Sequence, residues 1–220
     1  MIASKILKAM GQFIEDQMGM ISGAVGPVVF VKGTDGKTLV RSKPTPSKAP
    51  ASPKQQQNRN KFALMKHVTG LFYPILKECY TDFLGKDNAR DAVRSYYMAQ
   101  VIQKEQDAWR IAYEKVLIST GRVRAYVPVS QSRDAQQVVL HWQATTQQPF
   151  AEASDLLSVL LYAPDTEDFV FYKACTTRAA ATHTLELPEA LSTQPLEVYT
   201  TFSTATETEF AYSTYLGRMV

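Results

Sequence analysis

"DLLSVLLYAPDTEDFVFYKA" (residues 155–174) contains two runs rich in Val, Leu, Phe and Tyr, separated by the turn-type residues Pro164 and Asp165. Such runs are typical of neighbouring β-strands. Seven short strands in about a hundred residues favour an immunoglobulin-like or fibronectin-like β-sandwich, with Trp142 as a core aromatic. The segments expected to form strands are residues 112–120, 137–144, 155–163, 168–174, 182–188, 196–204 and 209–217.

The region before these strands has a helical pattern. Apolar residues recur at three-four spacing from Phe62 to Phe83, which predicts a helix over about residues 55–83. Pro74 lies inside this helix and predicts a kink or a break. A second helix is expected over residues 85–108, capped by Asp87 or Asn88. Two helices joined by a short turn that contains glycine predict an antiparallel helical hairpin.

The N-terminal part of the chain combines a helical pattern with a strand pattern. Apolar residues from Ile2 to Met18 at helix-like spacing predict a short amphipathic helix that ends near Gly19. Residues 28–31 and 38–40 then predict a β-hairpin whose turn is formed by residues 34–36. A two-stranded hairpin is marginal by itself, so we expect it to pair with another sheet.

Residues 43–61, "KPTPSKAPASPKQQQNRNK", form a basic segment with four prolines and no acidic residue. The prolines favour an extended, polyproline-like path, and nothing in the segment can build a core. We call this segment the basic strap. A solvated linker is the simplest interpretation. Alternatively, the basic strap is an arm that docks on another protein or on a nucleic acid.

The charge of the chain is distributed unevenly. Residues 1–61 hold ten basic and three acidic residues, a net charge of +7, whereas the rest of the chain carries a net charge of −4. Such asymmetry indicates a basic arm that meets an acidic surface or a polyanion. The acidic surface would belong to a neighbouring copy of the chain or to another protein. The strap lacks interleaved aromatic residues for stacking on bases, so nucleic acid is not the favoured partner.

No motif in the sequence predicts catalysis or a cofactor. "GTDGKT" (residues 33–38) lacks the first glycine of a phosphate-binding loop, because Val31 stands at that position, and no helix is expected after it. It is interpreted as a hairpin turn. His67, His141 and His183 show no metal-ligand spacing, so we expect structural roles for them. We therefore expect a protein that is not an enzyme, with no catalytic, cofactor-binding or metal-binding residues.

Three further features bear on function. The carboxylates of Asp165 and Asp168 are compatible with a cation contact, but the pattern of a calcium loop is absent. Cys79 and Cys175 match no redox spacing, and buried thiols are favoured over a disulfide between them. The sequence has no apolar block long enough for a membrane span or a classical secretion signal, which predicts a virion or other particle assembled in the cytoplasm, or otherwise a cytoplasmic protein.

Four short motifs occur in a characteristic order along the chain. They fall on Gly23, Val25, Gly26, Pro27, Val28 and Val29; on Arg41, Ser42 and Pro44; on Arg59, Lys61 and Phe62; and on Tyr215, Leu216 and Gly217. In this order they resemble a domain-of-unknown-function family from Bacteroidota and their phages, which has a glycine-rich N-terminal segment, a helical middle and an Ig-like β region.

The resemblance covers most of the chain after Gly19 and implies no catalytic residues, which suits a non-enzymatic role. The chain departs from the family's pattern in its N-terminal amphipathic helix. It departs again in the hairpin turn at residues 34–36. The family's pattern implies an aromatic residue followed by a glycine there, whereas this chain has Thr34, Asp35 and Gly36.

These observations together predict an α+β protein in three parts. Residues 1–54 would form an N-terminal helix, a β-hairpin and the basic Pro-rich arm, residues 55–110 a helical hairpin, and residues 111–220 an Ig-like β-sandwich. The expected function is that of a structural or assembly protein, a component of a phage virion or other particle, which self-associates through its N-terminal arm. The expected interface residues are Val28, Phe30, Arg41, Lys43, Lys48, Lys54 and Arg59.

Two other functions remain open at this point. The first is an Ig-like module that binds a glycan or a protein, which exposed aromatic residues such as Phe150 and Phe169 at one end of the sandwich would favour. The second is a genome-packaging protein that binds nucleic acid through the basic strap, with an affinity that falls steeply with salt.

Overall fold

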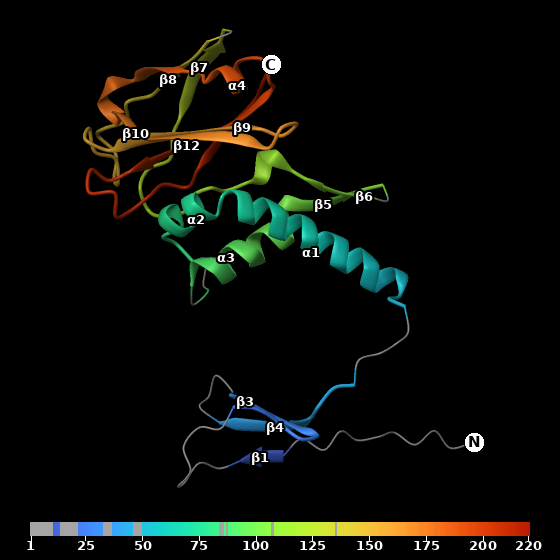
Figure 1. Cartoon of the computed structure of the whole chain (residues 1–220). Coiled ribbons are helices and arrows are strands. Elements are labelled where there is room, and N and C mark those ends of the chain that lie inside the picture. The colour runs from blue at the N-terminus through green and yellow to red at the C-terminus, as the bar shows by residue number, and fades with distance from the viewer. Residues whose placement is uncertain are drawn as a thin grey trace. The chain divides into compact units, whose positions relative to one another are not determined.

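The computed structural model of the protein describes residues 11–13, 22–32, 37–45, 50–83, 86, 88–106, 108–134 and 136–220 (Figure 1). The chain divides into two compact units, Met1–Ala51 and Ser52–Val220. The predicted α+β class is confirmed, and strands outnumber helices among the described residues.

The first unit contains one four-stranded antiparallel sheet. Its strands are β1 (Gly11–Phe13), β2 (Gly23–Val25), β3 (Val28–Lys32) and β4 (Thr38–Ser42), in the spatial order β1-β4-β3-β2. The predicted hairpin is confirmed, because β3 pairs with β4 in a register that places Phe30 opposite Val40. The glycine-rich segment before it adds β2, which turns into β3 through Gly26 at a φ of +57° and Pro27.

The predicted N-terminal helix is wrong where the structure describes it. Residues Gly11–Phe13 form β1, which pairs with β4 and places Gly11 opposite Val40. A short apolar run fits both a helix and a strand, and the unpaired edge of β4 decides between them by offering backbone hydrogen bonds. The rest of the predicted helix, and the turn at residues 34–36, lie outside the described residues.

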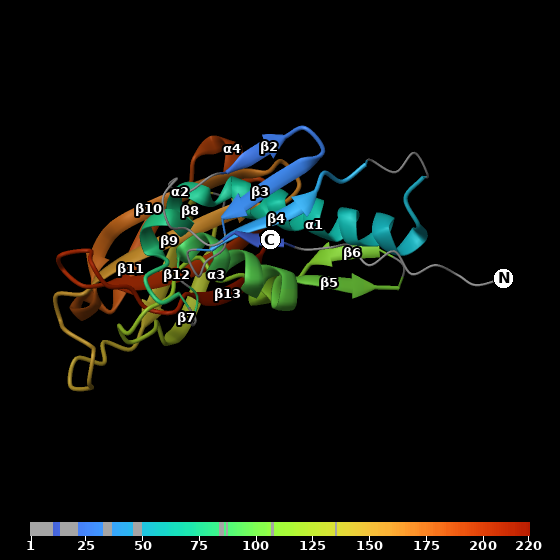
Figure 2. The ribbon, with the colours of Figure 1, turned by 90° about the horizontal axis from the view of Figure 1, so that it is seen from below.

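The second unit begins with a broken helix. α1 (Pro53–Leu71) and α2 (Tyr73–Cys79) are separated at Phe72, and Pro74 stands in the first turn of α2, so the predicted break is confirmed. The next helix, α3 (Ala89–Tyr96), starts at the predicted cap, because the side chain of Asn88 accepts a hydrogen bond from the Asp91 amide at 2.9 Å. α1 and α3 run side by side in opposite directions (Figure 2).

The second helix is shorter than predicted. α3 widens into a π-helical turn, Tyr97–Val101, and the chain then forms a hairpin of β5 (Ile102–Glu105) and β6 (Ala108–Ile111). Residues 103–107 are all polar and give no apolar stripe that would continue a helix, so strand pairing prevails. The hairpin lies against α1, where the ammonium of Lys61 stands 4.8 Å from the centre of the Trp109 ring.

Two antiparallel sheets form the rest of the second unit. One has the order β10-β9-β12-β13 and the other the order β11-β8-β7. A short helix α4 (Glu189–Ser192) precedes β12. The strands are β7 (Pro128–Arg133), β8 (Gln137–Trp142), β9 (Leu156–Ala163), β10 (Asp168–Thr177), β11 (Thr182–Glu186), β12 (Leu196–Ser203) and β13 (Thr214–Met219).

The apolar content of β9 follows from its central position. Alternate residues such as Leu157 and Leu161 face a core shared with the three-stranded sheet, whereas Leu160 and Tyr162 face a second core shared with the helices. A strand that is covered on both faces reads as a nearly continuous apolar run. The second unit therefore has three layers, with the β9 sheet between the helices and the other sheet (Figure 1).

Three strand predictions need correction. Residues 112–120 form no strand but contain a 3-10 turn, Tyr113–Lys115, and their apolar side chains, such as Ile118, fill the core on the helix side of the β9 sheet. β7 was missed because every residue from Pro128 to Ser132 is exposed, so it carries no apolar pattern. The last strand begins at Thr214, five residues later than predicted.

Candidate functional site

The predicted interface residues of the first unit lie on two faces of one sheet. Val28 and Phe30 are two residues apart on β3 and share a face. Arg41 is paired with Val29, so it lies on the opposite face. The expected cluster is therefore divided between the two sides of the sheet.

The centre of the face that carries Phe30 is apolar and lies between two glycines, whereas Thr38 and Ser42 lie on the same face towards the two ends of β4. Its central row crosses the sheet as Gly23, Phe30, Val40 and Gly11. No described atom lies within 4 Å of the place that a Cβ at Gly23 would take. Glycine in a strand often marks a site where another backbone or a ligand approaches closely. We call Val25, Val28, Phe30 and Val40 the Phe30 face; Val25 on its edge is 64% exposed.

The basic residues of the predicted interface are distributed over both units. Lys43 follows β4, is exposed, and donates its backbone N–H to the Pro27 carbonyl at 2.7 Å. Lys48 lies outside the described residues. Lys54 and Arg59 are exposed on α1 and belong to the second unit.

The first turns of α1 extend beyond the core. Residues 53–60 are exposed on every side, yet the helix start is well defined by a capping box. Ser52 accepts a hydrogen bond from the Gln55 amide at 3.3 Å, and Gln55 accepts one from the Ser52 amide at 3.0 Å. Local capping therefore maintains this segment without tertiary contacts.

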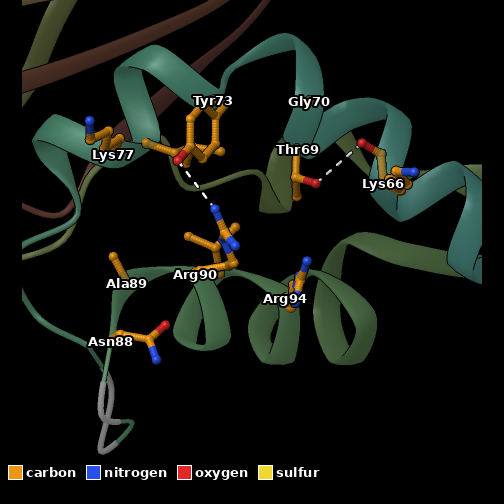
Figure 3. A pocket seen from close by; sticks show the side chains of 11 residues that line it. Lys66, Thr69, Gly70, Tyr73, Lys77, Asn88, Ala89, Arg90 and Arg94 are labelled. Atoms are coloured by element: carbon orange, nitrogen blue, oxygen red, sulfur yellow. Dashed lines mark hydrogen bonds between the residues drawn. The ribbon is translucent and has the colours of Figure 1, made fainter. Parts of the chain in front are cut away.

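A groove of about 530 Å³ lies where α1, α2 and α3 meet, and we call it the elbow groove (Figure 3). The break at Phe72 opens it, and Gly70 leaves room on its wall, since no described atom lies within 4 Å of where a Cβ would stand. Its floor is apolar and its rim is basic. The lining residues are Lys66, Thr69, Gly70, Tyr73, Leu76, Lys77, Asn88, Ala89, Arg90, Val93 and Arg94.

The electrostatics of the groove are positive. Arg90 and Arg94 lie one turn apart on the same side of α3, and both reach towards the space below α1 and α2 (Figure 3). Arg90 donates a hydrogen bond to the Tyr73 hydroxyl at 3.4 Å, and this contact lowers the pKa of Tyr73. Among the described acidic residues, Asp91 makes a weak contact with Arg94, because the two groups are 3.9 Å apart and both are mostly exposed.

The elbow groove was not predicted from the sequence. The signals for its shape were present in Gly70 and Pro74, which open and bend the helix. The spacing of Arg90 and Arg94 also places two cations on one helix face. What the sequence does not contain is the packing of α3 against α1 and α2, which brings these signals to one place.

A second cavity, of about 510 Å³, lies at the end of the sheets where β9 begins. Phe150 lines it with a φ of +61° and is 67% exposed, and Tyr212 and the two arginines Arg122 and Arg124 also line it. Phe169, the other predicted ligand aromatic, lies at the opposite end of β9 and packs edge-on against Phe72 at 5.8 Å. The two aromatics therefore do not form one site.

The three histidines lie in different places. His67 on α1 contacts the Glu167 carboxylate at 3.1 Å, His141 is exposed on β8, and His183 is half-buried on β11. Asp165 lies 3.9 Å from Arg218. In the part of the chain that the structure describes, no group of three or more His, Cys, Asp or Glu side chains is placed to hold a metal ion.

Both cysteines are free thiols, as predicted. Cys79 is buried in the core beside the helices, and burial raises the pKa of its thiol to about 12. Cys175 is half-buried, and burial raises the pKa of its thiol to about 11. Thiols with raised pKa values are poor nucleophiles at neutral pH, so neither supplies a reactive centre.

The comparisons with known proteins identify a family. A model described as a family of unknown function, DUF6266, matches residues 20–217. The chain belongs to DUF6266. The match includes β2, β3 and β4 of the first unit, so three of the four strands of this sheet belong to the DUF6266 region, along with the helices and the sheets of the second unit. No curated protein and no solved structure matches the chain.

Among the described helices of this DUF6266 protein, none combines the length and the apolar character that crossing a bilayer requires. The longest, α1, is polar over residues 53–60.

Proposed function

We propose that this protein is a non-enzymatic structural or assembly protein, a component of a virion or other particle, that associates with further copies of itself through its N-terminal unit. The observation that carries the proposal is the Phe30 face, a row of apolar side chains with glycines on both sides. Edge strands and apolar sheet faces are the surfaces through which β-proteins pair with one another.

The energetics of docking favour this unit as an arm. Apolar burial stabilises an interface by about 25 cal/mol per Å² removed from water. A proline-stiffened strap gives up less conformational freedom on docking than a flexible one, so more of the contact energy remains as affinity. The basic residues of the arm, including Lys43, would select an acidic partner surface and disfavour others. Residues 62–220, with a net charge of −4, suit a neighbouring copy as that partner.

For the second unit we propose an Ig-like sandwich. Labelled A to G in chain order, β7 to β13 give one sheet of strands E, B and A and another of D, C, F and G. The immunoglobulin constant-type arrangement has strands A, B, E and D in one sheet and C, F and G in the other. The difference is the fourth strand, β10, which here pairs with β9. This sandwich would present the exposed surface of the assembled particle.

The test compares two substitutions on β3 in the full chain, Phe30→Glu and Val31→Glu. The two residues are neighbours, but their side chains lie on opposite faces of the sheet. Sedimentation velocity over a range of concentrations should show an oligomer for the unmodified chain and for Val31→Glu, and dissociation for Phe30→Glu. An unmodified chain that is monomeric at all concentrations, or a Phe30→Glu variant that keeps its mass, would overturn the proposal.

A second candidate function is a ligand-binding module at the Phe150 cavity. The observation that favours it is the left-handed φ of a bulky, exposed side chain, a conformation that costs energy and persists where function or surroundings maintain it. Screening a panel of soluble oligosaccharides against the unmodified chain and Phe150→Gly tests this candidate. Binding that is lost in Phe150→Gly supports it, and the absence of binding to the unmodified chain argues against a glycan.

A further inference from the structure

The elbow groove combines an apolar floor with a rim of four cations. Leu76 and Val93 are almost fully buried and form part of the floor, and the ring of Tyr73, 46% exposed, stands at its side. A volume of about 530 Å³ falls in the range of pockets that hold small organic molecules. The basic residues on the rim are Lys66, Lys77, Arg90 and Arg94.

Two of these cations lie close enough to repel one another. Arg90 and Arg94 are one helical turn apart, a spacing at which like charges repel. Arg90 contacts the neutral hydroxyl of Tyr73, and among the described acidic side chains Asp91, on the same helix, comes to 3.9 Å from Arg94. An anion placed between α3 and the elbow would relieve this repulsion and would accept charge-assisted hydrogen bonds from both guanidinium groups.

We propose that the elbow groove binds an amphiphilic organic anion, with its carboxylate, phosphate or sulfonate group between Arg90 and Arg94 and its apolar body on the floor beside Tyr73. The guanidinium groups supply the planar pairs of donors that suit such acid groups. The apolar floor adds affinity for the body of the ligand and discriminates against inorganic anions. This inference is independent of the assembly proposal, because it concerns only α1, α2 and α3.

Gly70 offers a direct test that removes no charge. A Cβ at this position meets no described atom within 4 Å, so a larger side chain would extend into open space on the groove wall. Replacing a helical glycine also improves helix propensity, by up to about 1 kcal/mol. Gly70→Leu should therefore fill the groove while the protein stays folded, which separates loss of binding from loss of structure.

The experiment is isothermal titration calorimetry of the full chain with three probes. 2-Naphthoate carries an aromatic body and a carboxylate, 2-naphthylmethanol carries the same body without charge, and inorganic phosphate carries charge without an apolar body. We expect 2-naphthoate to bind at one site per chain, about tenfold or more tighter than the alcohol, which is the effect of a charge-assisted hydrogen bond. We expect phosphate to bind more weakly than 2-naphthoate.

The variants assign the binding to the groove. Arg90→Gln should weaken 2-naphthoate binding about tenfold, and Gly70→Leu should abolish it. Arg122→Gln, which removes a cation from the rim of the Phe150 cavity, should leave it unchanged. The proposal is overturned by the absence of saturable binding up to about 5 mM, by equal affinity for acid and alcohol, by phosphate binding as tightly as 2-naphthoate, or by a folded Gly70→Leu variant that still binds.

Discussion

The Nε atom of Arg178 lies 2.9 Å from the Oδ2 atom of Asp155, and neither side chain is more than 3% exposed. A second nitrogen of Arg178 donates to the Arg124 carbonyl at 2.7 Å, and the guanidinium lies 3.9 Å above the ring of Phe202. Asp155 in turn accepts a hydrogen bond from the Glu152 amide at 3.0 Å. This ion pair joins the loop before β9 to the segment after β10.

Breaking this pair should destabilise the second unit strongly. Arg178→Met leaves the Asp155 carboxylate buried without its partner, which costs about 3–5 kcal/mol of unfolding free energy. Arg110→Met is the matched control, because Arg110 lies at the same 2.9 Å from Glu105 but both side chains are more than half exposed. An exposed pair contributes about 0–1 kcal/mol. Urea unfolding measures the unfolding free energy of both variants. An equal decrease in Arg178→Met and Arg110→Met would contradict this explanation.

Removing the helix cap should loosen the start of α1. Ser52→Ala deletes the oxygen that accepts from the Gln55 amide, which lowers the local stability by about 1 kcal/mol. Since residues 53–60 have no packing to compensate, the loss should appear as faster hydrogen exchange in the first turns of α1. Ser52→Asp, which retains a capping oxygen, should exchange like the unmodified chain. Unchanged exchange in Ser52→Ala would show that the cap is dispensable.

Phe150→Gly should stabilise the protein. The left-handed φ of +61° at this position costs a phenylalanine about 1 kcal/mol or more, and glycine adopts it without strain. The exposed ring contributes little packing that would be lost, since 67% of the residue is in contact with solvent. The midpoint temperature of thermal unfolding should therefore be higher for Phe150→Gly than for the unmodified chain and for Phe150→Ala. A lower unfolding temperature for Phe150→Gly would show that the ring makes important contacts.

Stability should fall at alkaline pH. The Cys79 thiol has its pKa raised by burial from 9.0 to about 12, so the folded state retains a proton that the unfolded state loses. Its contribution is fully present below pH 9 and is lost as the pH rises towards 12. Burial also raises the pKa of Tyr97, whose hydroxyl donates to the Leu117 carbonyl at 3.0 Å, and that contribution is lost above about pH 10.

Urea unfolding at about pH 8 and about pH 11 tests this dependence. Cys79→Ala should be less stable than the unmodified chain at the lower pH, because it leaves a small cavity in the core. Its further loss of stability on going to the higher pH should be smaller, because one titrating group is gone. Identical pH dependence in both proteins would mean that the Cys79 thiol ionises as easily in the folded state as in the unfolded one.

Local signals in the sequence predicted the local structure. The break at Pro74, the cap at Asn88 and the hairpin of β3 and β4 depend on the chemistry of a few adjacent residues, and each was predicted. β9 was also found, because its burial on both faces produces an apolar run. These elements need no knowledge of their neighbours.

The predictions that failed depend on tertiary partners. Gly11–Phe13 is a strand because β4 offers a free edge, and residues 112–120 are irregular because they fill a core instead of pairing with a sheet. The elbow groove needs the packing of α3 against α1 and α2, which no local pattern encodes. The division of Val28 and Arg41 between two faces follows from the β3–β4 register, which the sequence did not supply.

Light scattering of the full chain and of a shortened chain that starts at Ala51 tests the proposed assembly most directly. Starting at Ala51 removes all of the first unit except its last residue but keeps Ser52 and its capping box, and the second unit retains both of its cores. The account predicts a full chain with the mass of an oligomer and a folded, monomeric shortened chain. The same number of chains per particle in the two proteins would contradict the account. The basic strap would then be interpreted as a linker.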